Sequence, residues 1–413
     1  MTLEDILQAQ QRLRDIVQQT PLTHSSTFSR LAGAEVYLKC ENLQRTGSFK
    51  IRGAYNRLAL LSPAQRKRGV IAASAGNHAQ GVALAAKLLG IEATVFMPEN
   101  TPLAKVAATQ GYGATIRLEG QDYDDACQAA LRFQAHSKAI FVHPFDDEAV
   151  IAGQGTIGCE ILDQLPEVDA IVVPVGGGGL ISGIALAAKA LRPELQVLGA
   201  ALHELSPLPS RRERVRVREP GAARNPLPQG EGARATIADG INVRESGTLT
   251  LPLIDRLVDD VVTVEEEDIS HAMVMLLERS KLVVEGAGAV GLAALLAGRV
   301  ELPGKKVAVV LSGGNIDVNL MARIIEHGLA TSGRYLIFET WLQDKPGELL
   351  KVLQILLDER ANILSVEHRR PASFPEVEVM LTVETRDFAH GERLLDRLRA
   401  QAYRVNRLQL GRS

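Results

Sequence analysis

A lysine in an apolar setting is the first residue whose position suggests chemistry. Residues 46–54 read Thr-Gly-Ser-Phe-Lys-Ile-Arg-Gly-Ala, which puts Lys50 between Phe49 and Ile51 at the predicted start of a helix. Partial burial lowers the pKa of a lysine and makes its amine a nucleophile toward carbonyl groups. Taken alone, the same pattern also fits an ordinary surface lysine.

A run of four glycines is a candidate phosphate site. The apolar residues 170–175 predict a buried strand, and the glycines lead from it into a helix. Consecutive glycines let backbone N–H groups converge on an anion at a helix N-terminus. The alternative is a tight turn, but four glycines would make such a turn costly in conformational entropy. The candidate residues are Gly176, Gly177, Gly178, Gly179 and Leu180.

The spacing of these glycines excludes the common nucleotide motifs and favours another cofactor. Residues 176–180 match neither GxGxxG nor GxxxxGK[ST], so a dinucleotide or a nucleoside triphosphate is not indicated. A nucleophilic lysine together with a phosphate cradle suits a cofactor that carries both an aldehyde and a phosphate. Pyridoxal 5′-phosphate has both groups.

Two polar segments also follow predicted strands. Residues 74–78 read Ser-Ala-Gly-Asn-His before a helix, and residues 312–315 read Ser-Gly-Gly-Asn. Serine and asparagine side chains with free N–H groups suit a carboxylate, although the first segment could be a simple helix cap. Because ligands of doubly wound sheets sit at the carboxyl ends of strands, we expect all these motifs to share one edge.

The motifs GSFKIRGA, SAGNHAQG, GGGGL and SGGN, in this order, resemble the fold-type II pyridoxal-phosphate enzymes, and within them the threonine dehydratase (threonine ammonia-lyase) family. The resemblance covers about residues 1–325, apart from 201–234. The C-terminal part, with DKPGELLKVL and ANILSVEHRR, resembles an ACT domain, a module that typically binds an amino-acid effector.

The resemblance implies a role for each site residue. Lys50 would hold the cofactor covalently and then remove the substrate Cα proton. Phe49 would pack on the pyridine ring and Asn77 would hydrogen-bond the 3-hydroxyl group. Backbone N–H groups of residues 176–180 would bind the phosphate, and Ser312 would meet the ring nitrogen. The substrate carboxylate would be received by the segment that contains Ser74, Gly76 and His78.

The implied reaction is β-elimination from L-threonine to 2-oxobutanoate and ammonia, the first step toward isoleucine, with L-serine as a secondary substrate. Three alternatives remain open: a serine racemase or dehydratase, a β-replacing synthase, and an amino-acid sensor with a catalytically weak core. Ala75 stands where relatives close to serine racemase carry serine, which disfavours racemisation. Residues 285–289, Glu-Gly-Ala-Gly-Ala, either border the site or form a helix-start turn.

The elements that must position these residues form a predicted α/β fold. Strands and helices alternate from about 35 to 325, which indicates two doubly wound parallel-sheet subdomains in a catalytic part, 1–327. The small subdomain, about 40–150, is inserted in the large one. Residues 205–234, rich in proline and arginine, predict an irregular loop. Residues 334–413 follow the βαββαβ order of a ferredoxin-like α+β fold, after a linker at 328–333.

The ACT-like part predicts regulation by a small molecule. Asp344 could bind an effector amine at an interface between two such domains, and Asn362 suits a neighbouring turn. Inhibition by isoleucine is the expected effect, and a dimerising module without ligand is the alternative. We expect a homo-oligomer, a dimer or a tetramer.

Composition excludes several other classes of partner. The chain has 413 residues, 46% of them hydrophobic, and a net charge of −3, which gives no electrostatic case for nucleic acid or an anionic membrane. Its three cysteines form no CxxC pair and suit a reducing cytoplasm. The sequence has no apolar run long enough to span a membrane and no signal peptide. His24, His143 and His271 lack metal-ligand spacing, so no metal site is expected.

Overall fold

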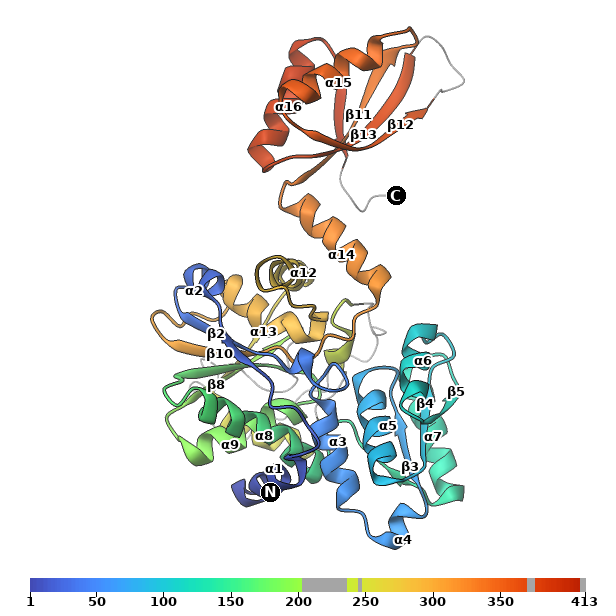
Figure 1. Cartoon of the computed structure of the whole chain (residues 1–413), viewed down its shortest axis with the longest axis vertical. Coiled ribbons are helices and arrows are strands. Elements are labelled where there is room, and N and C mark those ends of the chain that lie inside the picture. The colour runs from blue at the N-terminus through green and yellow to red at the C-terminus, as the bar shows by residue number, and fades with distance from the viewer. Residues whose placement is uncertain (203–235, 244–246, 370–375, 409–413) are drawn as a thin grey trace, which may run out of the picture. The chain divides into compact units, whose positions relative to one another are not determined.

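The structure, a computed structural model, describes residues 1–202, 236–243, 247–369 and 376–408 (Figure 1). It divides into two compact units, Met1–Asp317 and Val318–Ser413. The predicted loop at 205–234 lies outside the described residues. The unit boundary falls before the predicted end of the catalytic part at 327, because residues 318–331 form a helix that belongs to the second unit. No helix among the described residues is long and apolar enough to cross a membrane.

A large sheet forms the centre of the first unit, in the order β1-β2-β10-β7-β8-β9. All its neighbouring strands pair in parallel except β1 and β2 at one edge. Its strands are β1 (Leu22–His24), β2 (Glu35–Lys39), β7 (Ala170–Pro174), β8 (Gln196–Ala201), β9 (Asp260–Thr263) and β10 (Lys306–Val310). The central strand β7 is buried along its whole length, as expected for a parallel sheet with both faces covered.

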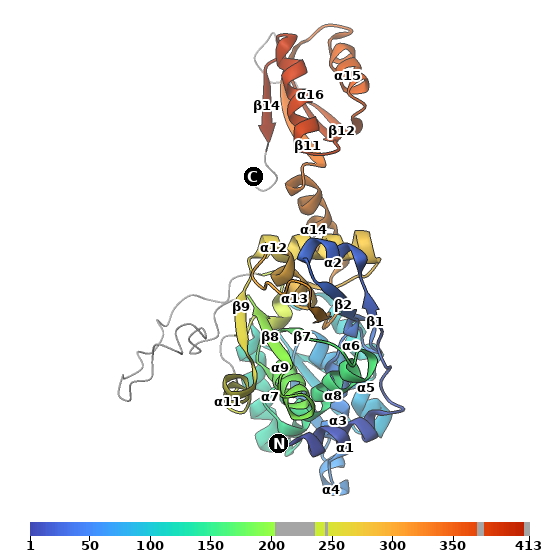
Figure 2. The same cartoon turned by 90° about the vertical axis from the view of Figure 1, so that its left-hand side faces the viewer.

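Helices cover both faces of this large sheet, as the two views show (Figures 1 and 2). The first of them, near the N-terminus, ends at Leu13. The helices are α1 (Leu3–Leu13), α2 (Ser26–Ala32), α8 (Glu148–Gln164), α9 (Gly179–Leu191), α11 (Thr250–Leu257), α12 (Glu266–Met275) and α13 (Gly286–Leu296). Short helical turns are η1 (Glu41–Leu43), η2 (Asp239–Ile241) and η3 (Leu276–Ser280).

A second parallel sheet, in the order β5-β4-β3-β6, lies within residues 70–141 of the same unit. Its strands are β3 (Val70–Ala73), β4 (Ala93–Met97), β5 (Thr115–Leu118) and β6 (Ile140–Phe141). The associated helices are α3 (Lys50–Ala59), α4 (Pro63–Arg66), α5 (Asn77–Leu89), α6 (Leu103–Gly111) and α7 (Tyr123–Ser137). The prediction of two parallel-sheet subdomains, the small one inserted in the large one, agrees with this arrangement.

The second unit carries an antiparallel sheet in the order β12-β13-β11-β14. Helices α15 and α16 lie on one face of this sheet (Figure 1), and its core includes Phe338, Leu356 and Leu394. The elements after helix α14 (Val318–Thr331) follow the predicted βαββαβ order. They are β11 (Tyr335–Gln343), α15 (Glu348–Asp358), β12 (Asn362–Arg369), β13 (Glu376–Glu384), α16 (Phe388–Ala400) and β14 (Val405–Leu408).

A buried group of four charges fixes helix α3, the helix that begins with Lys50. The Arg52 guanidinium donates to both carboxylate oxygens of Glu41 at 2.9 and 2.8 Å and to those of Glu160 at 2.6 and 3.0 Å. Lys39 Nζ donates to Glu160 Oε2 at 2.6 Å. Arg52, Lys39 and Glu41 are 0% exposed. Two cations and two anions therefore share one dry cluster of zero net charge, with their hydrogen-bonding groups matched.

Small residues let α3 approach its neighbour α8 at the same place. A Cβ added at Gly53 would lie 2.7 Å from Val150 O, and one at Gly153 would lie 2.6 Å from Arg52 O. The backbones of α3 and α8 are thus in direct contact, and Arg52 joins them through Glu160. The rotation of α3 about its axis is fixed, and with it the direction in which Lys50 leaves the helix.

The charge cluster predicts a non-additive effect on stability. Removing one charge by Glu160→Gln leaves an uncompensated buried cation and should lower the free energy of unfolding by about 3–5 kcal/mol. The double variant Lys39→Met/Glu160→Gln restores neutrality and should be more stable than Glu160→Gln alone. Urea unfolding followed by circular dichroism measures both. A double variant whose loss of unfolding free energy equals the sum of the losses of the two single variants would contradict this interpretation.

Candidate active site

Lys50 lies at the junction of the two subdomains with its amine buried. Its Nζ donates to Pro144 O at 2.9 Å and lies 5.1 Å from the centre of the Phe49 ring. Burial lowers the pKa of Lys50 to about 8, although the negative charge of Glu285 opposes this shift. Roughly a tenth of the amine is therefore uncharged at pH 7, far more than for an ordinary lysine, and the uncharged form is the nucleophile.

Neighbouring residues leave no room for a Cβ atom at any of the four glycines of the loop, which explains the residue type. A Cβ at Gly176 would lie 2.8 Å from Ile241 Cα, and one at Gly177 would lie 2.3 Å from the Phe145 ring. Gly178 has φ +89°, which favours glycine, and a Cβ there would meet Ile254 and Thr250. The loop can therefore present only backbone groups to a ligand.

These backbone groups lead directly into helix α9. The first N–H of this helix to donate to a carbonyl of the preceding turn is that of Ser182, which bonds Gly178 O at 3.0 Å. The N–H groups of Gly179, Leu180 and Ile181 thus have no partner within the helix, as at every helix N-terminus. These N–H groups lie at the N-terminal end of the helix, where the positive part of the helix dipole attracts an anion.

Asn77 belongs to a polar cluster that joins the two subdomains. Its Nδ2 donates to Glu285 Oε1 at 2.6 Å, and its Oδ1 accepts from Asn315 Nδ2 at 2.7 Å. Asn315 Nδ2 also donates to Thr46 O at 2.6 Å. Burial raises the pKa of Glu285 to about 7, with a further contribution from the negative charge of Asp239. One Asn77 amide hydrogen remains for another acceptor.

Ser312 and Phe49 lie next to each other in the buried part of the site. Phe49 N donates to Ser312 O at 3.1 Å, and an isolated β-bridge joins Ser48 to Gly313. Ser312 is 4% exposed. Leu180 packs in the same hydrophobic cluster as Phe49. The structure thus brings these predicted residues together around the start of α3.

The predicted carboxylate segment forms the N-terminus of helix α5, where its residues face different ways. Ser74 and Gly76 are partly exposed, and Gly76 N donates to Ser74 Oγ at 3.2 Å. The His78 ring is buried, and its Nε2 bonds Val142 O at 2.8 Å. Burial lowers the pKa of His78 to about 3, so the ring is neutral. His78 can serve a ligand through its backbone N–H, but its ring is already engaged.

The segment Pro144–Asp146 and Thr250 are site residues that the sequence motifs do not reveal. Pro144 O accepts from the Lys50 amine, the Phe145 ring covers Gly177, and Asp146 accepts hydrogen bonds from residues 248–250. No sequence motif marks these residues, because their importance lies in which backbone groups they meet. The proline before Phe145 and the acidic residues 146–148 are the only local signals.

The residues around Lys50 fit pyridoxal phosphate on structural grounds. The glycine loop has no room for side chains, and the Lys50 amine, whose pKa is lowered, bonds the carbonyl of Pro144, next to the residue Phe145 that packs against this loop. Among the described residues, Asn77 Nδ2 donates to Glu285 only, which leaves it a second hydrogen for a ligand. Ser48 adds a fully buried hydroxyl oxygen that has no hydrogen-bond partner among the described residues. An unpaired buried hydroxyl is costly, so it suits a site completed by a bound molecule.

Comparison with known proteins gives the same assignment. Residues 13–313 match the family described as "Pyridoxal-phosphate dependent enzyme". The chain belongs to this family of pyridoxal-phosphate-dependent enzymes, and the resemblance of the GSFKIRGA, SAGNHAQG, GGGGL and SGGN motifs to that family is confirmed.

Two of the similar proteins are named for threonine and one for serine. The chain is 50% identical to the L-threonine ammonia-lyase of Thermotoga maritima over 98% of this chain and 99% of that one. A threonine deaminase from Solanum lycopersicum is 35% identical with a TM-score of 0.70, over 78% of this chain and 91% of that one. Maize serine racemase is 37% identical with a TM-score of 0.71, over 80% of this chain and 98% of that one.

The raised pKa of Glu285 predicts how the stability of the cofactor-free protein changes with pH. In the folded protein Glu285 keeps its proton up to about pH 7, whereas in the unfolded chain its pKa is near the ordinary value of 4.5. The folded state therefore binds the proton more tightly, and the stability that this gives is lost as the pH rises from 4.5 to 7. Relative to Glu285→Gln, the parent should lose about 3 kcal/mol of unfolding free energy over this range. Urea unfolding at a series of pH values measures it. If the unfolding free energies of the parent and of Glu285→Gln changed with pH in parallel, the raised pKa of Glu285 would be contradicted.

Proposed function

We propose that this protein is an L-threonine ammonia-lyase that uses pyridoxal phosphate. One observation carries the proposal: a single segment joins the reactive amine to the phosphate loop. Lys50 Nζ bonds the carbonyl of Pro144, and the next residue, Phe145, packs against Gly177 and Gly179. The similarity to a named L-threonine ammonia-lyase extends over 98% of this chain, whereas that to maize serine racemase covers 80% of it.

The Lys50 amine acts twice in this proposal. It would hold the cofactor covalently, and the cofactor, when bound, would supply an electron sink for the carbon next to the amino group. The free amine then takes the Cα proton of the substrate. With a pKa of about 8, it can both accept and return a proton near neutral pH. Loss of the β-hydroxyl as water gives an enamine, which tautomerises and hydrolyses to 2-oxobutanoate and ammonia.

The other site residues hold the reactants in place. The 176–180 loop binds the phosphate through N–H groups, Phe49 supports the ring, and Asn77 meets the 3-hydroxyl. Ser312 would meet the ring nitrogen, and a hydroxyl there would leave that nitrogen largely neutral, which would moderate the electron sink and favour elimination. The substrate carboxylate lies at the N-terminus of α5, near Ser74 and Gly76, where partial positive charge stabilises it.

A racemase, a synthase and a sensor remain the competing functions. Racemisation needs an acid on the second face of the substrate, and Ala75 supplies none. A synthase would add a nucleophile after elimination, so L-serine with and without a thiol distinguishes it. A weak sensor would bind amino acids without turnover.

Activity and its dependence on Lys50 test the proposed function. The purified protein supplied with pyridoxal phosphate should release 2-oxobutanoate from L-threonine at a steady rate and pyruvate from L-serine more slowly. Lys50→Ala removes the linking amine and the base, and should lower kcat by at least about 10³-fold. Lys67→Ala, which changes an exposed lysine after α4, is the matched control. Full elimination activity in Lys50→Ala would overturn the mechanism.

The second unit is proposed to bind an amino-acid effector. Asn362 and Asp344, the two predicted effector residues, lie at opposite ends of the sheet within one chain, because β11 and β12 both run antiparallel to β13. Nine-residue strand β11 separates these ends by roughly 27 Å. Asp344 can therefore join an effector held near Asn362 only from another copy of the chain.

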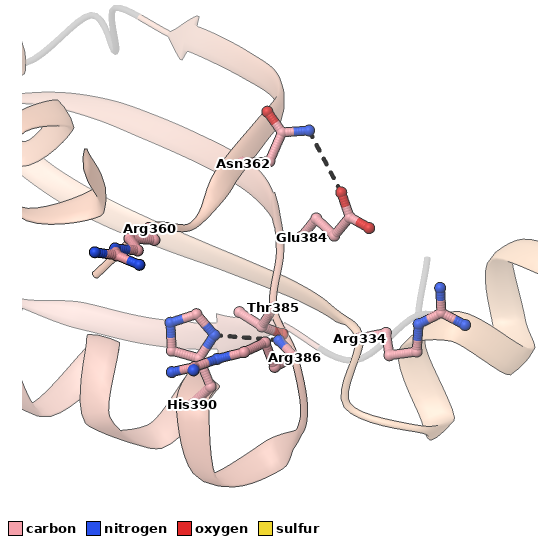
Figure 3. A pocket seen from close by; sticks show the side chains of 7 residues that line it. All are labelled: Arg334, Arg360, Asn362, Glu384, Thr385, Arg386 and His390. Carbon is pink, nitrogen blue, oxygen red and sulfur yellow. Dashed lines mark hydrogen bonds between the residues drawn. The ribbon is translucent and has the colours of Figure 1, made fainter. Parts of the chain in front are cut away.

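A pocket at the Asn362 end supports a carboxylate ligand (Figure 3). It has a volume of about 310 Å³. Asn362 Nδ2 donates to Glu384 Oε2 at 3.4 Å at one side of it. Guanidinium groups suit a carboxylate, and Glu384 suits an amine. The lining residues are Arg334, Arg360, Asn362, Glu384, Thr385, Arg386 and His390.

An exposed edge strand supports the proposed homo-oligomer. Every residue of β12 is exposed, and this strand is one of the two edge strands of the sheet. Its apolar side chains Ile363, Leu364 and Val366 are 37%, 43% and 39% exposed. An apolar edge with free backbone groups is a surface that pairs with another strand. We propose that copies of the chain associate here, as a dimer or as part of a tetramer.

The effector proposal predicts a change in substrate saturation. Isoleucine should shift the threonine saturation curve to higher concentrations. Arg360→Gln should weaken this shift by about 5-fold or more, because a charged hydrogen bond to the carboxylate is lost. Arg399→Gln, which alters an exposed arginine of α16 paired with Asp396, is the control. Saturation curves unchanged by isoleucine and by valine would contradict the proposal.

A further inference from the structure

Thr250 lies beneath the phosphate loop and is hydrogen-bonded to it. It is the first residue of α11 and is 0% exposed. Its Oγ1 donates to Gly177 O at 2.7 Å and accepts from Gly247 N at 3.0 Å. Its own carbonyl accepts from Ser182 Oγ, in the first turn of α9, at 3.3 Å. One buried threonine thus holds both the loop and the helix that follows it.

Asp146 fixes the position of Thr250. Its carboxylate accepts from Thr248 N at 3.0 Å, Thr248 Oγ1 at 2.9 Å, Leu249 N at 2.8 Å and Thr250 N at 3.2 Å. These bonds satisfy N–H groups at the start of α11, which have no partner within the helix. Asp146 follows Phe145, the residue whose ring covers Gly177. The loop is therefore held from one side by Phe145 and from the other by Thr250.

The hydroxyl group has a consequence for the direction of the loop's N–H groups. In a planar trans peptide, C=O and N–H point in opposite directions. The bond from Thr250 to Gly177 O therefore directs the N–H of Gly178 away from α11. Glycines on both sides of this peptide place little steric limit on its rotation, so a loop of four glycines does not choose this orientation by itself.

We propose that Thr250 is a positioning residue for the phosphate site: its hydroxyl selects the loop conformation in which the N–H groups converge on the cofactor phosphate. The proposal rests on the cofactor binding that underlies the proposed function. Thr250 does not touch the phosphate. It acts through Gly177, so its loss should weaken the binding of a phosphate-bearing ligand while leaving the Lys50 amine in place.

Three threonine variants separate the hydroxyl from packing. Thr250→Val keeps the side-chain volume and removes the hydroxyl, whereas Thr250→Ser keeps the hydroxyl and removes a methyl group. Thr248→Val makes the same chemical change two residues away at an exposed site, where Asp146 keeps three other hydrogen bonds. The measurements are the Kd of pyridoxal phosphate for the cofactor-free protein and the ³¹P chemical shift of the bound phosphate.

The expected pattern follows the hydroxyl and not the volume. Thr250→Val should raise Kd by about tenfold or more and move the ³¹P signal, because Gly177 O loses its donor. Thr250→Ser and Thr248→Val should stay within about threefold of the parent. A Thr250→Val protein with the parent's Kd and ³¹P shift would overturn the inference, even if its melting temperature fell. A parent protein that takes up no pyridoxal phosphate would overturn both the inference and the proposed function.

Discussion

The arrangement of the site depends on how one short segment, Pro144–Asp146, is held between two parallel sheets. Its three residues make three different contacts: a carbonyl for the Lys50 amine, a ring over Gly177, and a carboxylate for the start of α11. Each of these contacts belongs to a different part of the chain. The distance between the amine and the phosphate loop is therefore set by only a few covalent bonds, which suits a ligand with two anchoring points of fixed separation.

Helix α3 carries two basic side chains, Lys50 and Arg52, whose pKa values shift in opposite directions. Arg52 meets two carboxylates in bidentate geometry, and these partners raise its pKa despite the cost of desolvation. Lys50, two residues earlier, meets a neutral carbonyl, so desolvation prevails and its pKa falls to about 8. The charged residue fixes the helix, and the residue whose charge is disfavoured becomes available for reaction with a carbonyl group.

The sequence was sufficient to predict the inner strands of the large sheet, a glycine loop after one of them and a lysine at the start of a helix, because these depend on local pattern. The edge strands β1 and β9 were not predicted. Apolar runs followed by glycine or serine mark strand ends, and parallel strands bring those ends together. The pairing of Asn77 with Glu285 could not be predicted, since the two are 208 residues apart in the chain and their contact depends on the closure of both subdomains. Thr250 carries no motif, and its role follows only from the carbonyl that it meets. Asp344 follows strand β11 and Asn362 begins strand β12, and the directions of these strands place the two residues at opposite ends of one sheet.

The most direct test of the account is to find which residue binds the cofactor. The protein loaded with pyridoxal phosphate would be reduced with borohydride, digested and mapped by mass spectrometry, which locates the resulting pyridoxyl group. We expect one modified residue per chain, at Lys50, the lysine whose amine bonds Pro144 O. Modification of another lysine, or a protein that carries no pyridoxyl group after reduction, would contradict the central claim.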